Sequence, residues 1–301
     1  MAGYTNLPFR TISYEYGACF AYTEMIAAKS VFKAYRAVSM MLPSPEEPFT
    51  GVQIYGSDLE YILKASEKLQ SFGKFIDINA GCPVKKVIRK GMGGALLQDL
   101  DKLFEIVRAL KKSLSVPVTV KTRLGWDKDE VEQIYNGLAE SGADMIVFHA
   151  RTVKQMFRGK ADWKALSRIR DRDVPIFISG DIFSPEDAVK AIEISGADGV
   201  LIARGAVGNP WIFSQVVSFV DRGFYRTPDL EERIGVMLEH LRKNIEFFGE
   251  KKGIVEFRKF VAGYTRDLKR SREFRSLFMK IEDYDSALDL VKEFFGSEVI
   301  T

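Results

Sequence analysis

The sequence contains few of the residues that build disulfide frameworks or metal sites. Its 301 residues include two cysteines, Cys19 and Cys82, and two histidines, His149 and His240. Two cysteines do not make a disulfide framework in a chain of this length, and the lack of any CxxC or HxxxH spacing argues against a structural zinc site. We therefore expect no bound metal, and we expect Cys19 to be a small buried hydrophobic residue.

Long apolar runs are also missing. No stretch approaches the roughly 18 apolar residues that a membrane-spanning helix needs. The opening residues, MAGYT, lack the basic and apolar regions of a secretory signal peptide. Hydrophobic residues make up 46% of the chain, which is ordinary for a globular protein with a substantial core. The sequence therefore predicts a cytoplasmic protein without a membrane partner.

The net charge is small but unevenly distributed. A formal charge of +3 does not by itself indicate a nucleic-acid partner. Residues 251–280, however, carry ten Lys or Arg and three Asp or Glu, a balance of +7, and residues 281–301 carry one Lys and six Asp or Glu, a balance of −5. Such blocks also occur on solvated helix faces, so the charge pattern leaves both interpretations open.

Short apolar runs alternate with longer amphipathic stretches through about residue 225. The short runs predict parallel strands that helices cover on both faces. We expect strands at residues 21–27, 49–56, 75–82, 116–123, 145–151, 174–181 and 199–206. We expect helices at residues 58–72, 101–114, 129–141 and 184–195, the last with a strong Ser-Pro-Glu-Asp start. The sequence Ser-Gly-Ala-Asp occurs at 141–144 and 195–198, each time just before a strand, which is typical of a repeated unit.

Repeated βα units of this kind predict a doubly wound sheet or a TIM barrel. Polar residues gather at the carboxyl ends of the predicted strands, where TIM barrels carry their active sites, so we favour a (β/α)8 barrel. Seven strands are clear, and an eighth would have to lie within residues 1–3. After Pro228 the pattern is helical, at residues 229–248, 255–268 and 284–295. We therefore divide the chain into a barrel, residues 1–225, and a small all-helical domain, residues 226–301.

The strongest local signal is the segment Ile76-Asp77-Ile78-Asn79-Ala80-Gly81-Cys82-Pro83. A buried strand runs into a turn that Gly81 permits and Pro83 fixes, which aims Cys82 at the mouth of the barrel. The basic residues that follow lead to a glycine-rich segment, Gly91-Met92-Gly93-Gly94, which we interpret as a possible lid. The alternative is a buried cysteine at a tight turn.

This motif resembles the signature of the tRNA-dihydrouridine synthase family of the bacterial type, in which N-x-G-C-P precedes G-x-G-G and two leucines. Here it extends from Asn79 to Leu97. Further segments are similar to the family at residues 1–10 (MAGYTNLPFR), 23–25 (TEM), 52–56 (VQIYG), 120–126 (VKTRLGW), 149–151 (HAR) and 203–205 (ARG). The resemblance covers essentially the whole chain.

The resemblance implies an FMN-dependent enzyme that reduces a D-loop uridine in tRNA. NADPH or NADH would reduce FMN, the flavin would pass hydride to C6 of uracil, and Cys82 would donate a proton to C5. A thiol with an ordinary pKa of about 8.5 is mostly protonated at neutral pH, so it can act as a general acid. The first flavin contacts of the family would fall on Met1 and Ala2.

Other strand ends carry candidate cofactor-binding residues. Gln53 would meet the carbonyl and NH edge of the flavin, although it is alternatively a polar surface residue. Lys121 interrupts an apolar strand and would stabilise a flavin anion, or else form an internal ion pair with Asp77 or Glu24. His149 would contact flavin or substrate, or be a core histidine with its hydrogen bonds satisfied.

Phosphate requires backbone N–H groups near the last two strands of such a barrel. Ser179-Gly180-Asp181 and Ala203-Arg204-Gly205 occupy these places, and Arg204 can pair with phosphate. The alternative is a pair of ordinary βα turns. Ser179 and Ala203 stand where Asn and Gly are commoner in the family, and we expect the backbone contacts to be retained because both residues are small.

Candidate tRNA-binding residues fall in two groups. Near the barrel mouth we assign Asn79, Lys85, Lys86, Arg89, Arg123 and Arg151. In the helical domain we assign Arg258, Lys259, Arg266 and Arg270. Aromatic residues interleave with them, and such rings can stack on bases: Phe257, Phe260, Tyr264 and Phe274. The alternative is an amphipathic helix with solvated charges. The family often has His and Trp-Tyr after its Arg-Lys, whereas Phe260 and Gly263-Tyr264 stand here.

Two other functions remain open from the sequence alone. An FMN barrel oxidoreductase for a small molecule, such as a dihydroorotate or dihydropyrimidine dehydrogenase, would share the phosphate site but not need the basic helices. A non-catalytic RNA-binding protein would bind no flavin. We favour the tRNA enzyme, acting as a monomer.

Overall fold

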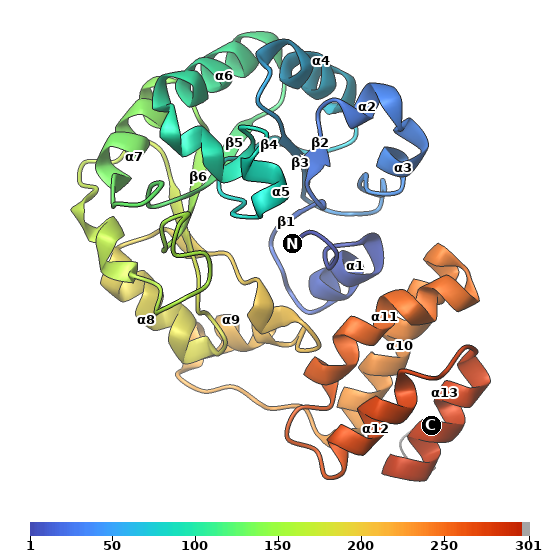
Figure 1. Ribbon diagram of the computed structural model, residues 1–301. Coiled ribbons are helices and arrows are strands. Elements are labelled where there is room, and N and C mark those ends of the chain that lie inside the picture. Colours follow the sequence, from blue (N-terminus) through green and yellow to red (C-terminus); the bar gives the residue numbers. More distant parts are fainter. Residues whose placement is uncertain (297–301) are drawn as a thin grey trace. The chain divides into compact units, whose positions relative to one another are not determined.

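All seven predicted strand segments contain β-structure in the computed structural model, which describes residues 1–296 (Figure 1). The strands are β1 (Ala21–Tyr22), β2 (Ile26–Ala27), β3 (Thr50–Tyr55), β4 (Ile76–Asn79), β5 (Val118–Arg123), β6 (Met145–His149), β7 (Ile176–Ser179) and β8 (Gly199–Val200). They form one parallel sheet in the order β1-β3-β4-β5-β6-β7-β8. β1 and β2 are two pieces of one predicted strand, because both pair with β3.

The helices of the sheet lie on the outside of its curl, as Figure 1 shows. They are α4 (Leu59–Leu69), α6 (Leu100–Ser113), α7 (Val131–Glu140) and α8 (Pro185–Ser195), and a 3-10 segment, η2 (Trp163–Arg168), follows β6. Short helices stand at the carboxyl ends of strands: α2 (Ser30–Lys33), α3 (Tyr35–Ser39), α5 (Lys85–Ile88) and the 3-10 segment η1 (Gly93–Gln98). This is a TIM-barrel arrangement. Among the described residues, no strand pairing joins β8 to β1, and residues 2–4 form a turn.

The chain divides into two units. Unit 1 comprises Met1–Asn6 and Cys19–Arg204, and it contains the whole sheet. Unit 2 comprises Leu7–Ala18 and the residues from Gly205 onward. Its helices are α1 (Leu7–Glu15), α9 (Ile212–Arg222), α10 (Leu230–Phe248), α11 (Glu250–Tyr264), α12 (Ser271–Phe278) and α13 (Tyr284–Phe295). The grouping of α1 with the later helices was not anticipated, and the functional division at residue 225 stays a prediction.

The repeated Ser-Gly-Ala-Asp turn has the same structural role in both copies. In the first, Asp144 accepts a hydrogen bond from the backbone N–H of Val118 at 2.6 Å, and its own N–H donates to the Val118 carbonyl. In the second, Asp198 accepts from the N–H of Ile176 at 2.8 Å and donates back in the same way. Each aspartate therefore ties the start of its strand to the start of the preceding strand, which sets the register of neighbouring βα units.

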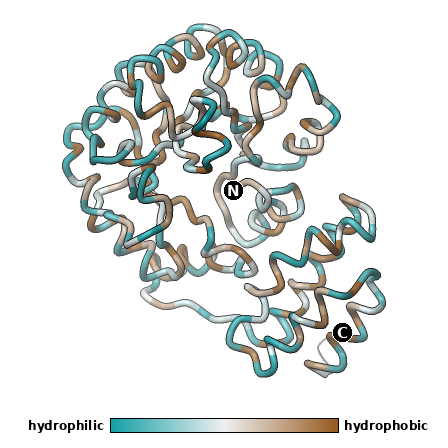
Figure 2. The backbone as a smooth tube through the Cα atoms, viewed as in Figure 1, coloured by the Kyte–Doolittle hydropathy of each residue, from teal (hydrophilic) through white to brown (hydrophobic). Residues whose placement is uncertain are grey.

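Local capping explains where the predicted helices begin. Ser184 and Asp187 form a reciprocal capping box at the start of α8, with Pro185 at the first helical position. Asp58 caps α4 by accepting a hydrogen bond from Tyr61. Hydrophobic and hydrophilic residues alternate along these helices in Figure 2, as expected of elements with one buried face.

Two predicted elements have boundaries that differ from the structure by four residues or more. The last strand was expected at residues 199–206, but β8 ends at Val200 and Arg204–Ala206 form a 3-10 turn, since β8 pairs only with β7 and the chain then leaves the sheet. Helix α11 was expected at residues 255–268 but spans Glu250–Tyr264. It begins directly after Gly249, whose φ of +82° turns the chain out of α10. Its backbone packs closely against α10 at Gly253, where an added Cβ would lie 2.6 Å from the Asn244 carbonyl oxygen.

Aromatic rings fill the amino-terminal end of the sheet interior. Phe20, Tyr22, Phe75 and Phe177 meet edge to face, with the Phe20 and Phe177 ring centres 5.4 Å apart. Edge-to-face pairs are favourable and leave little empty space. The interior is therefore closed at this end, and the polar side chains of the strands lie toward the carboxyl end.

No helix in the described part of the chain is long and apolar enough to cross a membrane. Within the same residues, no group of three or more His, Cys, Asp or Glu side chains is placed to hold a metal ion.

Candidate active site at the carboxyl end of the sheet

Asn79 holds the turn that carries Cys82. It is the last residue of β4, and its side-chain oxygen accepts hydrogen bonds from the backbone N–H groups of Gly81 at 3.2 Å and Cys82 at 3.0 Å. An Asn side chain that binds the backbone two and three residues later fixes a turn in the same way as a backbone hydrogen bond. The position of Cys82 is therefore set by the strand through Asn79.

The glycine-rich segment after Cys82 packs against the backbone of the cysteine and does not cover its side chain. Residues 93–97 are buried in η1, and the N–H of Gly94 donates to the Cys82 carbonyl at 3.0 Å. A Cβ on Gly94 would lie 2.8 Å from the side chain of Val153 and 3.0 Å from the Cys82 oxygen. The interpretation of this segment as a lid was therefore wrong, because its glycines are required for close packing.

The Cys82 thiol is partly buried, and its environment favours the protonated form. Burial raises the pKa of the thiol, since a thiolate would lose hydration there. The N–H of Val84 and the positive charges of Arg123 and Lys121 act in the opposite direction without overcoming the effect of burial. At neutral pH the group therefore carries a proton, as a general acid must. By contrast Cys19 is exposed, so the expectation that it is buried was wrong.

A row of polar side chains crosses the sheet interior next to this turn. The strand register pairs Gln53 of β3 with Asp77 of β4, and Asp77 with Thr119 of β5. The Gln53 amide N–H donates to Asp77 at 2.8 Å, and the Thr119 hydroxyl donates to the other carboxylate oxygen at 2.6 Å. Asn79 donates to the Gln53 side-chain oxygen at 2.9 Å. Both amides are thus oriented by one buried carboxylate, and Gln53 is not a surface residue.

Asp77 is the residue in this network that sequence reasoning missed, apart from naming it as a possible partner of Lys121. Its side chain is fully buried, and burial raises its pKa to about 7 although the hydrogen bonds from Thr119 and Gln53 and the charge of Lys121 lower it. The signal was available, because an Asp in an otherwise apolar strand needs buried partners.

Lys121 lies beside this row on β5, directly across from Asn79. Burial, together with the nearby Arg123, lowers the pKa of its ammonium group to about 8. Among the described residues no carboxylate lies within ion-pair distance of it, so the alternative of a direct pair with Asp77 or Glu24 is not found. A largely buried cation without such a partner suits an anionic ligand.

Arg123 and Arg151 are buried and bind backbone oxygens. Arg123 donates to the carbonyls of Gly81, Thr152 and Met156 at 2.8–2.9 Å, which connects the cysteine turn to the loop after β6. The Arg151 guanidinium donates to backbone carbonyls of that loop, at 3.2 Å to Arg158 and at 2.7 Å to Gly159, and to the Asp181 carboxylate at 2.5 Å. Both arginines therefore shape the site. Their guanidinium groups are bound to protein oxygens, so they act on the site mainly through their positive electrostatic potential.

His149 occupies the centre of this positive region. The register places it between Arg123 and Ser179, and its ring nitrogen lies 3.5 Å from the Arg151 guanidinium. Burial lowers the pKa of His149, and the nearby positive charges, of which Lys121 has the largest effect, lower it further, to about 2. The imidazole is therefore neutral. Gly180 has a φ of +114°, and a Cβ there would lie 2.8 Å from the His149 ring. The glycine is needed for the histidine to fit.

The two predicted phosphate loops lie side by side after β7 and β8. Asp181 adopts a left-handed conformation with φ of 55° and receives Arg151, the N–H of Ala161 and, at 3.2 Å, Arg204. These donors lower the pKa of Asp181 although burial opposes them. Ser179 is buried, and Ala203 and Arg204 are accessible. The structure thus brings the proposed loop residues together.

Arg204 also lies between two exposed rings, a contact that sequence reasoning did not foresee. Its guanidinium carbon lies 5.5 Å from the ring centre of Phe157 and 5.3 Å from that of Phe183. Cation–π contacts of this kind hold a planar guanidinium in place. The arginine at the predicted phosphate site is therefore held by Asp181 and by the two rings.

The remaining predicted residues near the site make few contacts with the residues described above. The amino group of Met1 donates to Thr5 at 2.9 Å, Ala2 is exposed, and the N–H of Gly3 donates to the Glu24 carboxylate. Lys85, Lys86 and Arg89 are exposed on or just after α5, three to seven residues beyond Cys82. They give this edge of the barrel mouth a positive charge.

In unit 2 the predicted basic residues are largely accessible, but their aromatic neighbours are not. Phe257, Phe260 and Phe274 have no exposed surface and Tyr264 has 1%. Phe257, Phe260 and Tyr264 pack around His240, and Phe274 joins them through Phe278, so these rings cannot stack on bases. The helical period explains the error, because aromatics three or four residues apart form the buried face while the basic residues between them form the surface.

The predicted tRNA-binding residues of unit 2 differ in how strongly they are engaged. Arg258 donates to the Ile281 carbonyl at 2.9 Å, and Lys259 pairs with Glu256. Arg270 pairs with Glu273 and lies 4.3 Å from the centre of the Phe294 ring. The side chain of Arg266 is exposed.

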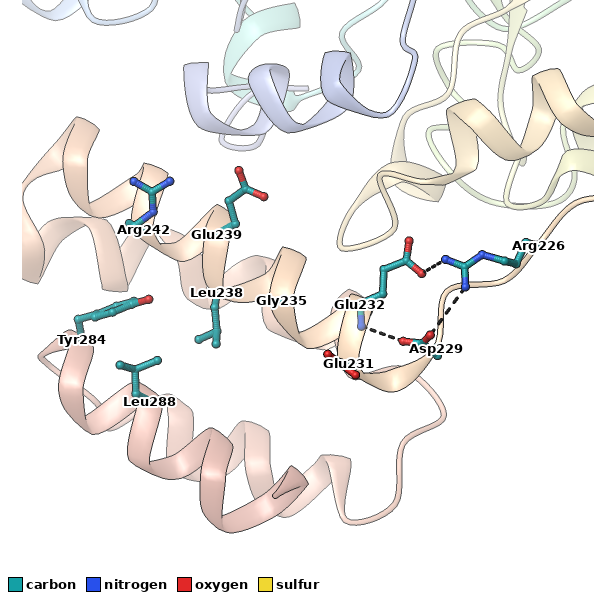
Figure 3. Close-up of a pocket in the computed structure, with 10 residues that line it drawn as sticks. All are labelled: Arg226, Asp229, Glu231, Glu232, Gly235, Leu238, Glu239, Arg242, Tyr284 and Leu288. Atoms are coloured by element: carbon teal, nitrogen blue, oxygen red, sulfur yellow. Dashed lines mark hydrogen bonds and ion pairs between the residues drawn. The ribbon is translucent and has the colours of Figure 1, made fainter. Parts of the chain in front are cut away.

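A pocket of about 760 Å³ lies in unit 2, but it does not contain the predicted chemistry (Figure 3). It is lined by Arg226, Asp229, Glu231, Glu232, Gly235, Leu238, Glu239, Arg242, Tyr284 and Leu288. Four carboxylates outnumber two arginines there, and Arg226 is already paired with Asp229 and Glu232. An acidic lining disfavours phosphate, so we place the active site at the strand ends instead.

Comparison with known proteins agrees with the geometry. The sequence model of one protein family, described as dihydrouridine synthase (Dus), matches residues 1–299. The chain belongs to the dihydrouridine synthase family. A tRNA-dihydrouridine synthase B from Pasteurella multocida (strain Pm70) is 35% identical over 98% of this chain and 91% of its own length. One from Pseudomonas aeruginosa is 36% identical over the same shares.

Solved structures give a more distant likeness. A crystal structure of DHODH from Eimeria tenella in complex with ferulenol is 18% identical and covers 57% of each chain with a TM-score of 0.45. The family assignment rests instead on the match of the dihydrouridine synthase model to residues 1–299.

Proposed function

We propose that this dihydrouridine synthase reduces a D-loop uridine of tRNA to 5,6-dihydrouridine, with FMN as its bound cofactor and Cys82 as the proton donor. The observation that carries the proposal is the position of Cys82, which Asn79 fixes at a strand end beside oriented amides and a buried cation. Burial raises the pKa of the thiol, which favours its protonated form. Family membership and the names of the relatives support the substrate.

The residues present suit a flavin mononucleotide. Lys121, Arg123, Arg151 and Arg204 bring four positive charges to the strand ends, and Asp181 pairs with two of them. We assign Gln53, Lys121 and His149 to the flavin ring. Lys121 would hold negative charge on the cofactor, and neutral His149 would offer a hydrogen bond.

The phosphate of the cofactor would lie at Ser179, Gly180, Asp181, Ala203 and Arg204. Gly180 allows close approach of the backbone, and Arg204 is held in place for a charge-assisted contact. Met1 and Ala2 would complete the cofactor site on the side of the first strand.

The reaction consumes one NAD(P)H and one proton for each uridine reduced. When bound, FMN supplies the hydride to C6 of uracil after reduction by NADPH or NADH. The Cys82 S–H bond breaks as the C5–H bond forms, and the thiolate then takes a proton from water. The burial that raises the pKa of the thiol makes this return of the proton favourable.

Substrate binding would use both units. Asn79, Arg123 and Arg151 would act near the uracil by shaping the site, while Lys85, Lys86 and Arg89 would meet the RNA backbone. Arg258, Lys259, Arg266 and Arg270 of unit 2 would neutralise further phosphates. The uridine must leave its stack to reach the strand ends. We further propose that the enzyme acts as a monomer in the cytoplasm without a metal.

The first experiment is the visible absorption spectrum of the purified protein, followed by mass analysis of the released cofactor. We expect absorption maxima at about 370 and 450 nm and the release of FMN. Unmodified tRNA and NADPH should then yield dihydrouridine in a nucleoside digest. A colourless protein that takes up no added FMN would overturn the assignment.

A further inference from the structure

Exposed aromatic rings and basic side chains alternate on the outer surface of α2, α3 and α4. Lys29 lies 4.8 Å from the ring centre of Tyr61, and the Tyr61 ring meets that of Phe32 at 6.1 Å. Lys68 lies 5.7 Å from the centre of Phe32 and 4.4 Å from that of Tyr35. We call these five side chains the aromatic–basic ladder. It contains the combination of residues that was predicted for the C-terminal helices, where the rings are buried.

The ladder remains open to solvent. Phe32 is 46% exposed and Tyr35 is 38% exposed, although rings of this size are normally buried. The chain around them, residues 29–40, has three basic residues and no acidic one. All three are exposed, and two of them, Lys33 and Arg36, have no ion-pair partner in the described part of the chain. A positive surface with accessible rings complements a polyanion with planar groups.

The ladder starts at the end of the barrel that carries Cys82 and extends along α4, whose last turn contains Lys68. Helix α2 begins three residues after β2 ends, and α4 begins four residues after β3 ends, so Phe32 and Tyr61 stand beyond the carboxyl ends of these strands. The strand that follows β3 in the sheet is β4, which leads into Cys82 and α5. Figure 1 shows α2, α3 and α4 together on one side of the sheet.

We propose that the aromatic–basic ladder, with Lys33 and Arg36, is an RNA-binding surface that holds a strand of the tRNA substrate beside the active site. The inference rests on the proposed function and adds a contact surface to it. Lys33 and Arg36 neutralise backbone phosphates, and the open faces of Phe32 and Tyr35 accept unpaired bases, which stack on any aromatic ring.

Local packing does not account for all of these residues. α2 and α3 are short and bury only Val31 and Val38 within their own spans, so the cation–π contacts of Lys68 do help to hold them on α4. Lys33 and Arg36 take no part in those contacts. Their substitution therefore tests RNA binding separately from packing.

The experiment measures the affinity of the oxidised, flavin-loaded protein for bulk tRNA from cells that lack dihydrouridine, over a series of salt concentrations. In Lys33→Glu/Arg36→Glu we expect about tenfold weaker binding and a salt dependence reduced by about 1.5 units of slope, because two phosphate contacts are lost. In Phe32→Leu/Tyr35→Leu we expect a similar loss with an unchanged slope. Lys112→Glu, an exposed position in the last turn of α6 at the opposite end of the barrel, is the matched control.

Each outcome decides the proposal. Weaker binding in both double variants but not in the control, with unchanged flavin content and NADPH oxidation, supports it. Wild-type affinity in Lys33→Glu/Arg36→Glu overturns it. A lower melting temperature in Phe32→Leu/Tyr35→Leu without lost affinity also overturns it, because the rings would then serve only to pack α2 and α3 against α4. A monomer–dimer shift in the variants would assign the surface to a second copy of the chain. Failure of the proposed function would appear differently, as a wild-type protein that forms no dihydrouridine.

Discussion

The side-chain oxygen of Asn79 accepts a 3.0 Å hydrogen bond from the backbone N–H of Cys82, and the amide nitrogen of the same side chain donates to Gln53 at 2.9 Å. One residue at the end of β4 therefore connects the proposed proton donor with a proposed flavin ligand. These contacts make Asn79 a residue that positions Cys82 and Gln53, in addition to its proposed role near the uracil.

Replacement of Asn79 by Ala should lower the rate at which tRNA reoxidises the reduced enzyme, by about a hundredfold, because a thiol displaced by about 1 Å transfers its proton poorly. Flavin content should stay near that of the wild type. The measurement is a single-turnover reaction of prereduced enzyme. Asn136→Ala, on the exposed face of α7, is the control, and an unchanged rate in Asn79→Ala would show that the turn holds without this side chain.

Replacement of Cys82 by Ala should leave FMN binding and NADPH oxidation intact but reduce the yield of dihydrouridine by about a hundredfold or more, the usual contribution of a general acid. Cys19→Ala, at the exposed cysteine, should be fully active. Because burial raises the thiol pKa, the uridine-reduction rate should stay level through neutral pH and fall only above the ordinary thiol range. Full activity of Cys82→Ala would refute the proton-donor role.

Replacement of Lys121 by Met should weaken FMN binding or slow its reduction by about tenfold or more, since it removes the buried cation that has no ion-pair partner among the described residues. The dissociation constant is measured by flavin fluorescence and the reduction rate by stopped flow. Lys128→Met is the matched control, because Lys128 is exposed beyond the end of β5 and pairs with Glu130 on the surface. If both quantities match the wild type, Lys121 has a structural role only.

Asp77 should make the stability of the protein depend on pH. Its folded-state pKa of about 7 exceeds the unfolded value of about 3.8, so its contribution is fully present below pH 3.8 and is lost as the pH rises through 7. Between pH 5 and pH 8 the free energy of unfolding of the wild type should fall, relative to that of Asp77→Asn, by about 2 to 3 kcal/mol. Urea denaturation of both proteins at the two pH values measures this difference, and a pH-independent difference would show that Asp77 is ionised in the fold.

Much of the barrel could be predicted because its signals are local. The apolar runs gave the positions of the strands, and Ser184-Pro185 and Asp58 gave the starts of two helices. The motif around Cys82 likewise indicated a strand end. In each case the residues that determine the structure are neighbours in the sequence.

The parts that were missed depend on contacts between distant segments. The partnership of Gln53 with Asp77 follows from the register of β3 against β4, which the pattern of apolar residues does not specify. Tight packing of η1 against Cys82 follows from the space that Gly94 leaves for Val153. The burial of Phe257 and its neighbours could have been anticipated, because their helical spacing is that of a core face.

His240 should make unit 2 sensitive to acid. Its ring is fully buried, its Nδ1 lies 3.0 Å from the Tyr264 hydroxyl, and within the described residues its Nε2 has no hydrogen-bond partner. Burial, together with the charges of Lys259 and Lys243, lowers its pKa to about 3. The imidazole is therefore neutral in the fold, whereas in the unfolded chain it takes up a proton below a pH of about 6.5.

Because the folded-state pKa is depressed, the stabilising contribution of His240 is present above pH 6.5 and is lost as the pH falls toward 3. Between pH 7 and pH 5 the wild type should lose about 2 kcal/mol more unfolding free energy than His240→Phe. His149 has a depressed pKa as well, so its contribution should remain in both proteins. Urea denaturation at the two pH values, with Tyr264→Phe as a variant that removes only the hydroxyl, tests this account. Equal acid sensitivity of the wild type and His240→Phe would mean that the buried imidazole accepts a proton without unfolding the helices around it.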